Sequence, residues 1–234
     1  MKQPIWLKIF IILIVYAGQL VYSTGLAAHR ARCPCTNVHI YAEKQSDITV
    51  VGEVLTETIS FVVEVGLDIQ DTFDIHLIEI LEGFPQQNLY LGVYKQQINE
   101  IHILSYESCK RRCLNDCCCG IELTRKLHTS LIVHEIAHAL TVNLLENKTG
   151  CIAAAEYIAY TTQFSLMPAD LRQRILADIT NEGFVNDVEI TSLFHDLSPS
   201  VFAVKAYKHF IRPENGKMFY KKLTSEQYIL DRED

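Results

Sequence analysis

The spacing of apolar positions divides the chain into an N-terminal part of mixed character and a helical C-terminal part. From residue 47 to residue 67, apolar side chains recur every three or four positions, as on a helix with one buried face. Residues 74–81 alternate between polar and apolar instead, which is typical of a strand. Short apolar runs predict further strands at residues 38–42, 89–95 and 98–106, and the last two predict a hairpin.

The second half of the chain has the pattern of a series of helices. Gly150 and Pro168 punctuate it, since Gly ends helices and Pro suits the first turn of a new one. The predicted helices span residues 128–145, 151–166, 169–179, 198–212 and part of 216–230. The pattern therefore predicts an α+β fold, in which mixed strands and a helix precede a helical half. No Gly-, Ser- or Pro-rich linker follows the leader, so we expect residues 28–234 to form a single domain.

The first 27 residues have the layout of a secretory signal peptide. Lys2 and Lys8 give a positive start, the segment 9–21 is apolar, and small residues follow it. An uncleaved signal anchor is the alternative, but the apolar segment is short of the roughly 20 residues that span a membrane. We therefore expect a secreted or periplasmic protein. If the leader stays uncleaved, we expect it to anchor the protein in a membrane with the folded part outside the cytosol. We expect no other contact of the protein with a membrane.

Charge and cysteine content narrow the function classes. The formal net charge is −7, which argues against nucleic acid as a partner because phosphates require a basic face. The chain has eight cysteines, all after the leader, and an even count in an exported chain favours disulfide bonds over a thiolate metal site. Their pairing cannot be deduced from the sequence. The cysteines are Cys33, Cys35, Cys109, Cys113, Cys117, Cys118, Cys119 and Cys151.

The strongest chemical signal is the sequence His134-Glu135-Ile136-Ala137-His138. Residues four apart lie on one face of a helix, so His134 and His138 can direct two imidazole nitrogens at one metal ion. Glu135 lies beside them, where a carboxylate can polarise a metal-bound water. The residues around the motif are apolar, which predicts a buried helix in which unpaired His and Glu side chains are costly. A metal ion would remove that cost.

A catalytic zinc ion needs a third protein ligand and an open position for water. Thr141 and Leu144 occupy the positions at which a metzincin has its Gly and third His, so that continuation is absent. Glu156 remains, 18 residues after His138 and flanked by alanines that allow close packing of helices. The alternative is a Glu that is satisfied by hydrogen bonds. We expect Glu156 to be the third ligand.

These residues resemble the gluzincin branch of the zincin metallopeptidases, in which a Glu on the next helix completes the zinc site. The specific part covers about 25 residues, and the chain is more loosely similar to small exported bacterial zincin-like proteins. The resemblance implies a zincin-like fold, Glu135 as general base, and a Tyr or His that stabilises the oxyanion. It also implies a substrate-binding edge strand before the metal helix, for which residues 98–106 are the best candidate by position.

Two residues are candidates for the oxyanion role. Tyr160 follows Glu156 by one helical turn and serves either the site or the core. His195, with Asp196 to orient it, is either an oxyanion donor or an ordinary surface histidine. A third histidine, His209, lies among basic residues, and we expect it on a solvated face.

The sequence thus predicts a Zn²⁺-dependent metallopeptidase that acts on a peptide or protein substrate. Zinc would be held by His134, His138 and Glu156, with Glu135 as the base and Tyr160 or His195 as the oxyanion donor. Two alternatives remain open. One is a zinc-binding protein without catalysis, and the other is a disulfide-rich secreted interaction protein in which the motif is accidental.

Overall fold

A computed structural model describes residues 29–33, 36–69, 72–81, 91–112, 121–145, 151–225, 228 and 230. It contains one five-stranded sheet with the strand order β1-β2-β3-β5-β4. The strands are β1 (His29–Arg32), β2 (His39–Ala42), β3 (Asp74–Ile78), β4 (Gly92–Lys95) and β5 (Glu100–Leu104). The predicted leader lies outside the described residues.

The sheet combines parallel and antiparallel pairs. Strands β2, β3 and β5 run parallel to one another, whereas β1 pairs with β2 and β4 pairs with β5 in the antiparallel sense. The β4–β5 pair confirms the predicted hairpin. In its turn Asn99 has a φ of 57°, a left-handed conformation that Asn tolerates better than most residues. The expectation that residues 98–106 form the edge strand is wrong, because β5 lies inside the sheet and β4 is at the edge.

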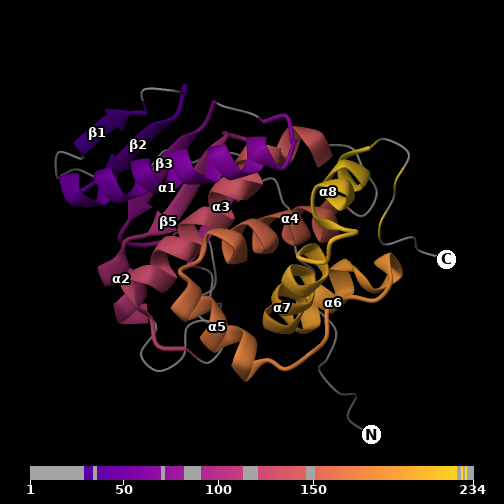
Figure 1. The fold of residues 1–234 in the computed structure, drawn as a ribbon. Coiled ribbons are helices and arrows are strands. Elements are labelled where there is room, and N and C mark those ends of the chain that lie inside the picture. The colour runs from indigo at the N-terminus through magenta and orange to yellow at the C-terminus, as the bar shows by residue number, and fades with distance from the viewer. Residues whose placement is uncertain are drawn as a thin grey trace, which may run out of the picture.

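Helices make up the rest of the described fold. They are α1 (Gln45–Glu64), α2 (Tyr106–Arg112), α3 (Arg125–Leu145), α4 (Cys151–Leu166), α5 (Ala169–Asp178), α6 (Ser192–Leu197), α7 (Pro199–Phe210) and α8 (Gly216–Thr224). The sheet lies at one end of the molecule and α6, α7 and α8 lie at the other, with α3 and α4 between them (Figure 1). The predicted α+β fold is therefore correct. The pattern missed β1, α2 and α6, which are all short.

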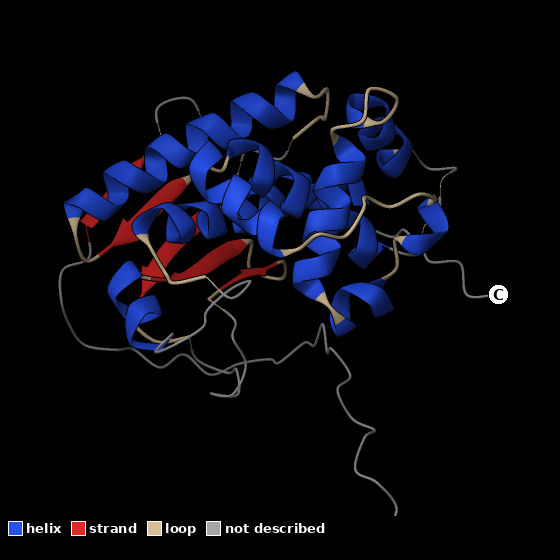
Figure 2. Ribbon diagram, turned by 60° about the horizontal axis from the view of Figure 1, so that its bottom comes forward, coloured by secondary structure: helices blue, strands red, loops and turns tan. Residues whose placement is uncertain are grey.

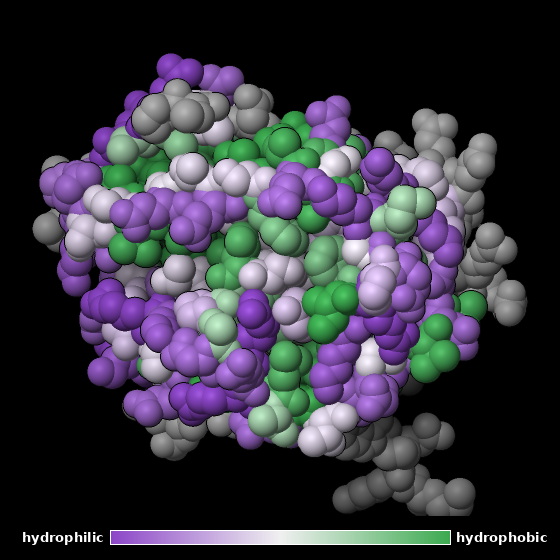
Figure 3. Space-filling model, in the orientation of Figure 1, coloured by the Kyte–Doolittle hydropathy of each residue, from purple (hydrophilic) through white to green (hydrophobic). Residues whose placement is uncertain are grey.

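Helices α1 and α3 cover one face of the sheet (Figure 2). Every second residue of β2, β3 and β5 is buried on this face, as at Ile40, Ile75 and Ile101. These side chains form one core with apolar residues of both helices. The outer side of α1 carries exposed acidic residues, and Figure 3 shows the resulting row of hydrophilic side chains between hydrophobic areas. The spacing of apolar residues predicted this helix because one side of α1 is apolar and buried and the other is polar and exposed.

Helix α4 connects the sheet half to the C-terminal helices. Ala153, Ala154 and Ala159 are buried, and their small side chains allow α4 to pack closely against its neighbours. On its other side, the O–H of Tyr157 bonds with Nδ1 of His209 at 2.7 Å. His209 is only 3% exposed, so the expectation of a solvated position is wrong. Its ring packs among aromatic side chains of α4 and α8.

The structure bears only in part on the predicted disulfide bonds and on the predicted membrane contact. Cys33 and Cys109, the cysteines whose side chains are described, are buried and free. The side chains of the other six are not among those described, so their disulfide bonds stay a prediction. Among the described residues, we find no helix whose length and apolar character would let it cross a bilayer.

Candidate metal centre

Helix α3 presents the histidine pair on one side. Its other residues are largely apolar and buried, which holds the helix in place between the sheet and α4. The rings of His134 and His138 lie edge to face with centroids 4.7 Å apart. Their Nε2 atoms are 3.1 Å from each other, so one can donate a hydrogen bond to the other. The spacing of four residues therefore places both nitrogens at one point, as the sequence predicts.

Glu156 on α4 faces this pair. One carboxylate oxygen lies 3.5 Å from Nε2 of His134, and the other lies 3.5 Å from Nε2 of His138. All three side chains are largely buried, with exposed fractions between 12% and 18%. The structure places Glu156 beside the two histidines, and its role as the third metal ligand stays a prediction. We call His134, His138 and Glu156 the helical centre.

The spacing of these atoms can be compared with the demands of a metal ion. The nitrogen–nitrogen distance is 3.1 Å and the two nitrogen–oxygen distances are 3.5 Å. A tetrahedral zinc ion with bonds of about 2.0–2.2 Å separates its ligand atoms by roughly 3.3 Å. Two imidazoles and a carboxylate are also a donor set that suits zinc. The helical centre thus fits a zinc ion with little movement of its side chains.

The charges within the helical centre are strongly coupled. Burial opposes a charge on Glu156, but His138 and His134 overcome it and lower the pKa of the carboxyl to about 2. Burial, with a further contribution from His134, lowers the pKa of His138 to about 4 despite the pull of Glu156. Burial also opposes a charge on His134, yet its bond with Glu156 raises the pKa of that imidazole. Glu156 is therefore ionised, and a cation beside it is favoured.

Glu135 points toward the edge of the sheet. A Cβ atom placed on Gly92 of β4 would lie only 2.8 Å from Cγ of Glu135, so no larger residue fits there without movement. The backbone N–H of Tyr94 bonds with the Glu135 carboxylate, and burial raises the pKa of that carboxyl to about 7 against the charge of His134. Glu135 is thus held between α3 and β4, next to the helical centre.

The two candidate oxyanion donors both reach this region. The ring of Tyr160 lies 4.5 Å from that of His134 and 5.9 Å from that of His195, measured between centroids. Nε2 of His195 is 3.4 Å from Oε2 of Glu156, and its Nδ1 is 3.2 Å from Asp196. The side chain of His195 is 17% exposed, so it lines the centre instead of lying on open surface. The structure therefore brings together the six residues that the sequence predicts for the metal centre, namely His134, Glu135, His138, Glu156, Tyr160 and His195.

Sequence reasoning missed Gln163, which lies one turn beyond Tyr160 on α4. Its side chain is 3% exposed, and its amide N–H donates to Ser130 at 3.3 Å. Gln163 also interacts with His134. Nδ1 of His134 is buried and has no hydrogen-bond partner of good geometry in the described part of the chain. A ligating imidazole needs an acceptor at that nitrogen, and a small rotation of Gln163 would supply one. The signal was available, since residues 156, 160 and 163 share one helix face.

Comparison with known proteins gives a family but no activity. Residues 38–233 match the model of a family described as "Family of unknown function (DUF6639)". The match covers most of the chain, and the chain therefore belongs to this family. A comparison with curated proteins returned no match.

Proposed function

We propose that this member of the DUF6639 family is a zinc-dependent metallopeptidase of zincin-like architecture. The observation that carries the proposal is the spacing of 3.1–3.5 Å among the donor atoms of His134, His138 and Glu156. Glu135 beside them supplies what a purely structural zinc site does not need. When bound, zinc would supply Lewis acidity, which lowers the pKa of a water and polarises a carbonyl.

The residues of the chain divide the remaining work. Glu135 accepts a proton from the attacking water and then delivers it to the leaving amine. His195 donates a hydrogen bond to the oxygen that develops negative charge, and Asp196 holds its ring at Nδ1. Tyr160 packs against His134 and fixes the orientation of that ring.

The edge strand β4 offers a place for a peptide substrate. The N–H of Leu104 bonds with the carbonyl of Leu91, and this register turns the backbone groups of Gly92 toward the outer edge of the hairpin. An extended peptide that pairs with this edge would run past Glu135, because Gly92 lies directly against that side chain. The substrate class is therefore a peptide or protein segment in extended conformation. The predicted leader would bring the enzyme to substrates outside the cytosol.

The test is hydrolysis of a broad peptide library at near-neutral pH. The purified protein should cleave members of the library, lose this activity with a chelator, and regain it when zinc is returned. Cleavage that a chelator leaves unchanged would contradict the proposal. If zinc binds and no peptide is cleaved, the zinc-binding protein without catalysis is the better description.

A further inference from the structure

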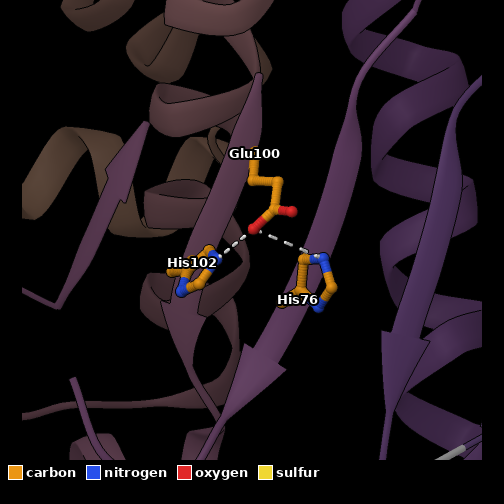
Figure 4. Close-up of side chains that lie close together, drawn as sticks. All are labelled: His76, Glu100 and His102. Carbon is orange, nitrogen blue, oxygen red and sulfur yellow. Dashed lines mark hydrogen bonds and ion pairs between the residues drawn. The ribbon is translucent and has the colours of Figure 1, made fainter. Parts of the chain in front are cut away.

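A second group of two histidines and a glutamate lies on the sheet, on the face turned away from α1 and α3. His76 on β3 and His102 on β5 are direct partners in the parallel ladder, and Glu100 precedes His102 by two residues. Side chains alternate along a strand, so these three share one face while Ile75 and Ile101 enter the core on the other. Figure 4 shows the three side chains converging in front of the two strands. We call His76, Glu100 and His102 the sheet cluster.

The distances within the sheet cluster are close to those of a metal site. Nε2 of His102 donates to Oε2 of Glu100 at 2.7 Å, and Nε2 of His76 lies 3.8 Å from the same oxygen. The three donor atoms all lie within 4.8 Å of one another. Ligand atoms around a tetrahedral zinc ion are roughly 3.3 Å apart, so small rotations of the Glu100 and His102 side chains would bring all three donor atoms to one ion.

Nε2 of His76 lacks a partner in the described part of the chain. The atom is buried, and its distance of 3.8 Å to Glu100 is too long for a hydrogen bond. The ring cannot easily turn to find another partner, because the ring of Tyr41 stacks on it at 4.5 Å with an angle of 6°. A buried polar nitrogen without a partner is costly. A cation between His76 and Glu100 would satisfy both groups.

Lys95 on β4 competes with such a cation. Its Nζ lies 3.2 Å from Nδ1 of His102, so the ammonium donates to that nitrogen and the ring keeps its proton on Nε2. A metal at Nε2 of His102 requires the proton to be on Nδ1, where it would face the ammonium group. Lys95 is only half-buried and can swing away. We therefore expect the Lys95 ammonium to compete with a metal ion for His102 and to lower the affinity of the sheet cluster for that ion.

We propose that His76, Glu100 and His102 form a second metal site, which binds a divalent transition ion of the zinc class and ties β3 to β5. Two imidazoles and one carboxylate favour zinc, copper or nickel over magnesium or calcium. With three ligands from the chain, water completes the coordination of the ion. The exposed fractions of the side chains, 20% to 29%, leave a path for the ion from solvent. The proposal does not rest on the function of the helical centre.

The test is a zinc titration of the purified protein that separates the two sites. In a H134A/H138A background the sheet cluster is the group of two histidines and a glutamate that remains among the described residues, and we expect one equivalent of zinc and a rise in the melting temperature on adding it. Adding His102→Ala to this background should weaken zinc binding about 100-fold or more, since loss of a supporting partner alone costs up to about 100-fold. Glu100→Gln, which keeps the shape of the side chain, should weaken it in the same direction.

Two further variants make the titration decisive. Lys95→Met removes the competing ammonium and should tighten binding by about 10-fold, which corresponds to about 1.4 kcal/mol. The side chain of His39 lies on the same face and bonds with Asp74 at 3.1 Å, but it supplies no atom to the sheet cluster, so His39→Ala should change zinc binding far less than His102→Ala. Zinc binding that is the same with and without His102, or that does not respond to Glu100→Gln, would overturn the proposal. A failure of peptide hydrolysis would leave this result untouched.

Discussion

The helical centre and the sheet cluster contain the same ligand types but differ in what surrounds them. In the helical centre the donor atoms are 3.1–3.5 Å apart, and Glu135, Tyr160 and His195 lie next to them. In the sheet cluster one nitrogen–oxygen distance is 3.8 Å, and Lys95, the ring of Tyr41 and Asp74 lie beside it. We propose that both groups hold an ion, but the nearby carboxylates differ. Glu135 lies next to the helical centre and against Gly92, whereas Asp74, the ladder partner of Glu100, is bonded with His39 at 3.1 Å.

The scaffolds explain this difference. Two helices packed side by side surround a point from several directions, so α3 and α4 can add a base, an aromatic support and an amide to the three ligands. Two neighbouring strands offer one flat face, on which side chains meet only across the ladder or two residues along it. A ligand set alone therefore does not make a catalytic site. The predictions below use one group as the control for the other.

The largest effect should come from removing a ligand of the helical centre. His138→Ala should reduce peptide hydrolysis about 10³-fold or more, because a metal ion supplies several kcal/mol of transition-state stabilisation. His76→Ala is the matched control in the sheet cluster and should leave the rate unchanged. The measurement is kcat/KM of both variants on the best library peptide. Equal losses in the two variants would remove the distinction between the groups.

The next effect separates binding of the ion from catalysis. His195→Ala should lower kcat about 10²-fold while the protein keeps its zinc, since one lost oxyanion donor costs about 10²–10³ in rate. Asp196→Asn should cost about 10-fold, because Asp196 orients the ring and does not itself donate to the oxyanion. Zinc content and kcat are measured on the same preparations. A loss of zinc in His195→Ala would make this residue a ligand instead of a donor.

How far the sequence predicts these regions depends on the kind of contact. The motif on α3 and the lone carboxylate on α4 were readable because helical periodicity fixes which residues share a face. The sheet cluster could not be predicted in this way. It depends on the register of β3 against β5, and no local pattern shows which strands are neighbours. For the same reason β4 and not β5 is the edge strand. The sequence predicts His209 on the surface because its neighbours in the sequence are lysines and an arginine. The structure buries it against α4 and α8, and its aromatic partners there are distant in the sequence.

A smaller effect concerns the contact between the sheet and the base. Gly92→Ala places a Cβ atom 2.8 Å from Cγ of Glu135, so the carboxylate must move. We expect kcat/KM to fall about 10-fold with zinc retained, since small displacements of a catalytic group are costly. Gly52→Ala is the control, because its new Cβ would lie 3.8 Å from Cδ1 of Ile40, an ordinary van der Waals distance. That helical substitution should instead stabilise the protein by about 0.5–1 kcal/mol.

The smallest effect concerns Glu79. Hydrogen bonds from side chains satisfy this carboxylate, so it needs no metal ion. Ser105 and Ser108 donate to it at 2.6 and 2.5 Å, and these bonds, with that of Arg111, lower the pKa of Glu79 against the effect of burial. A lowered pKa gives stability that is present above the unfolded value near 4.5 and is lost as the pH falls through the folded value. Because the side chain is 38% exposed, we expect at most about 1 kcal/mol.

The measurement for Glu79 is urea unfolding of the parent and of Glu79→Gln at pH 7 and at pH 3. The difference in unfolding free energy between the two proteins should be larger at pH 7 and shrink at pH 3. A difference that is constant with pH would mean that the hydrogen bonds, and not the charge, are what the substitution removes.

The most direct test of the central claim is Glu135→Gln in the helical centre. The substitution keeps the size of the side chain and removes only its ability to accept a proton. The account predicts that this variant binds zinc as the parent does and hydrolyses the best peptide at least about 100-fold more slowly. A variant that binds zinc normally and cleaves as fast as the parent would contradict the account.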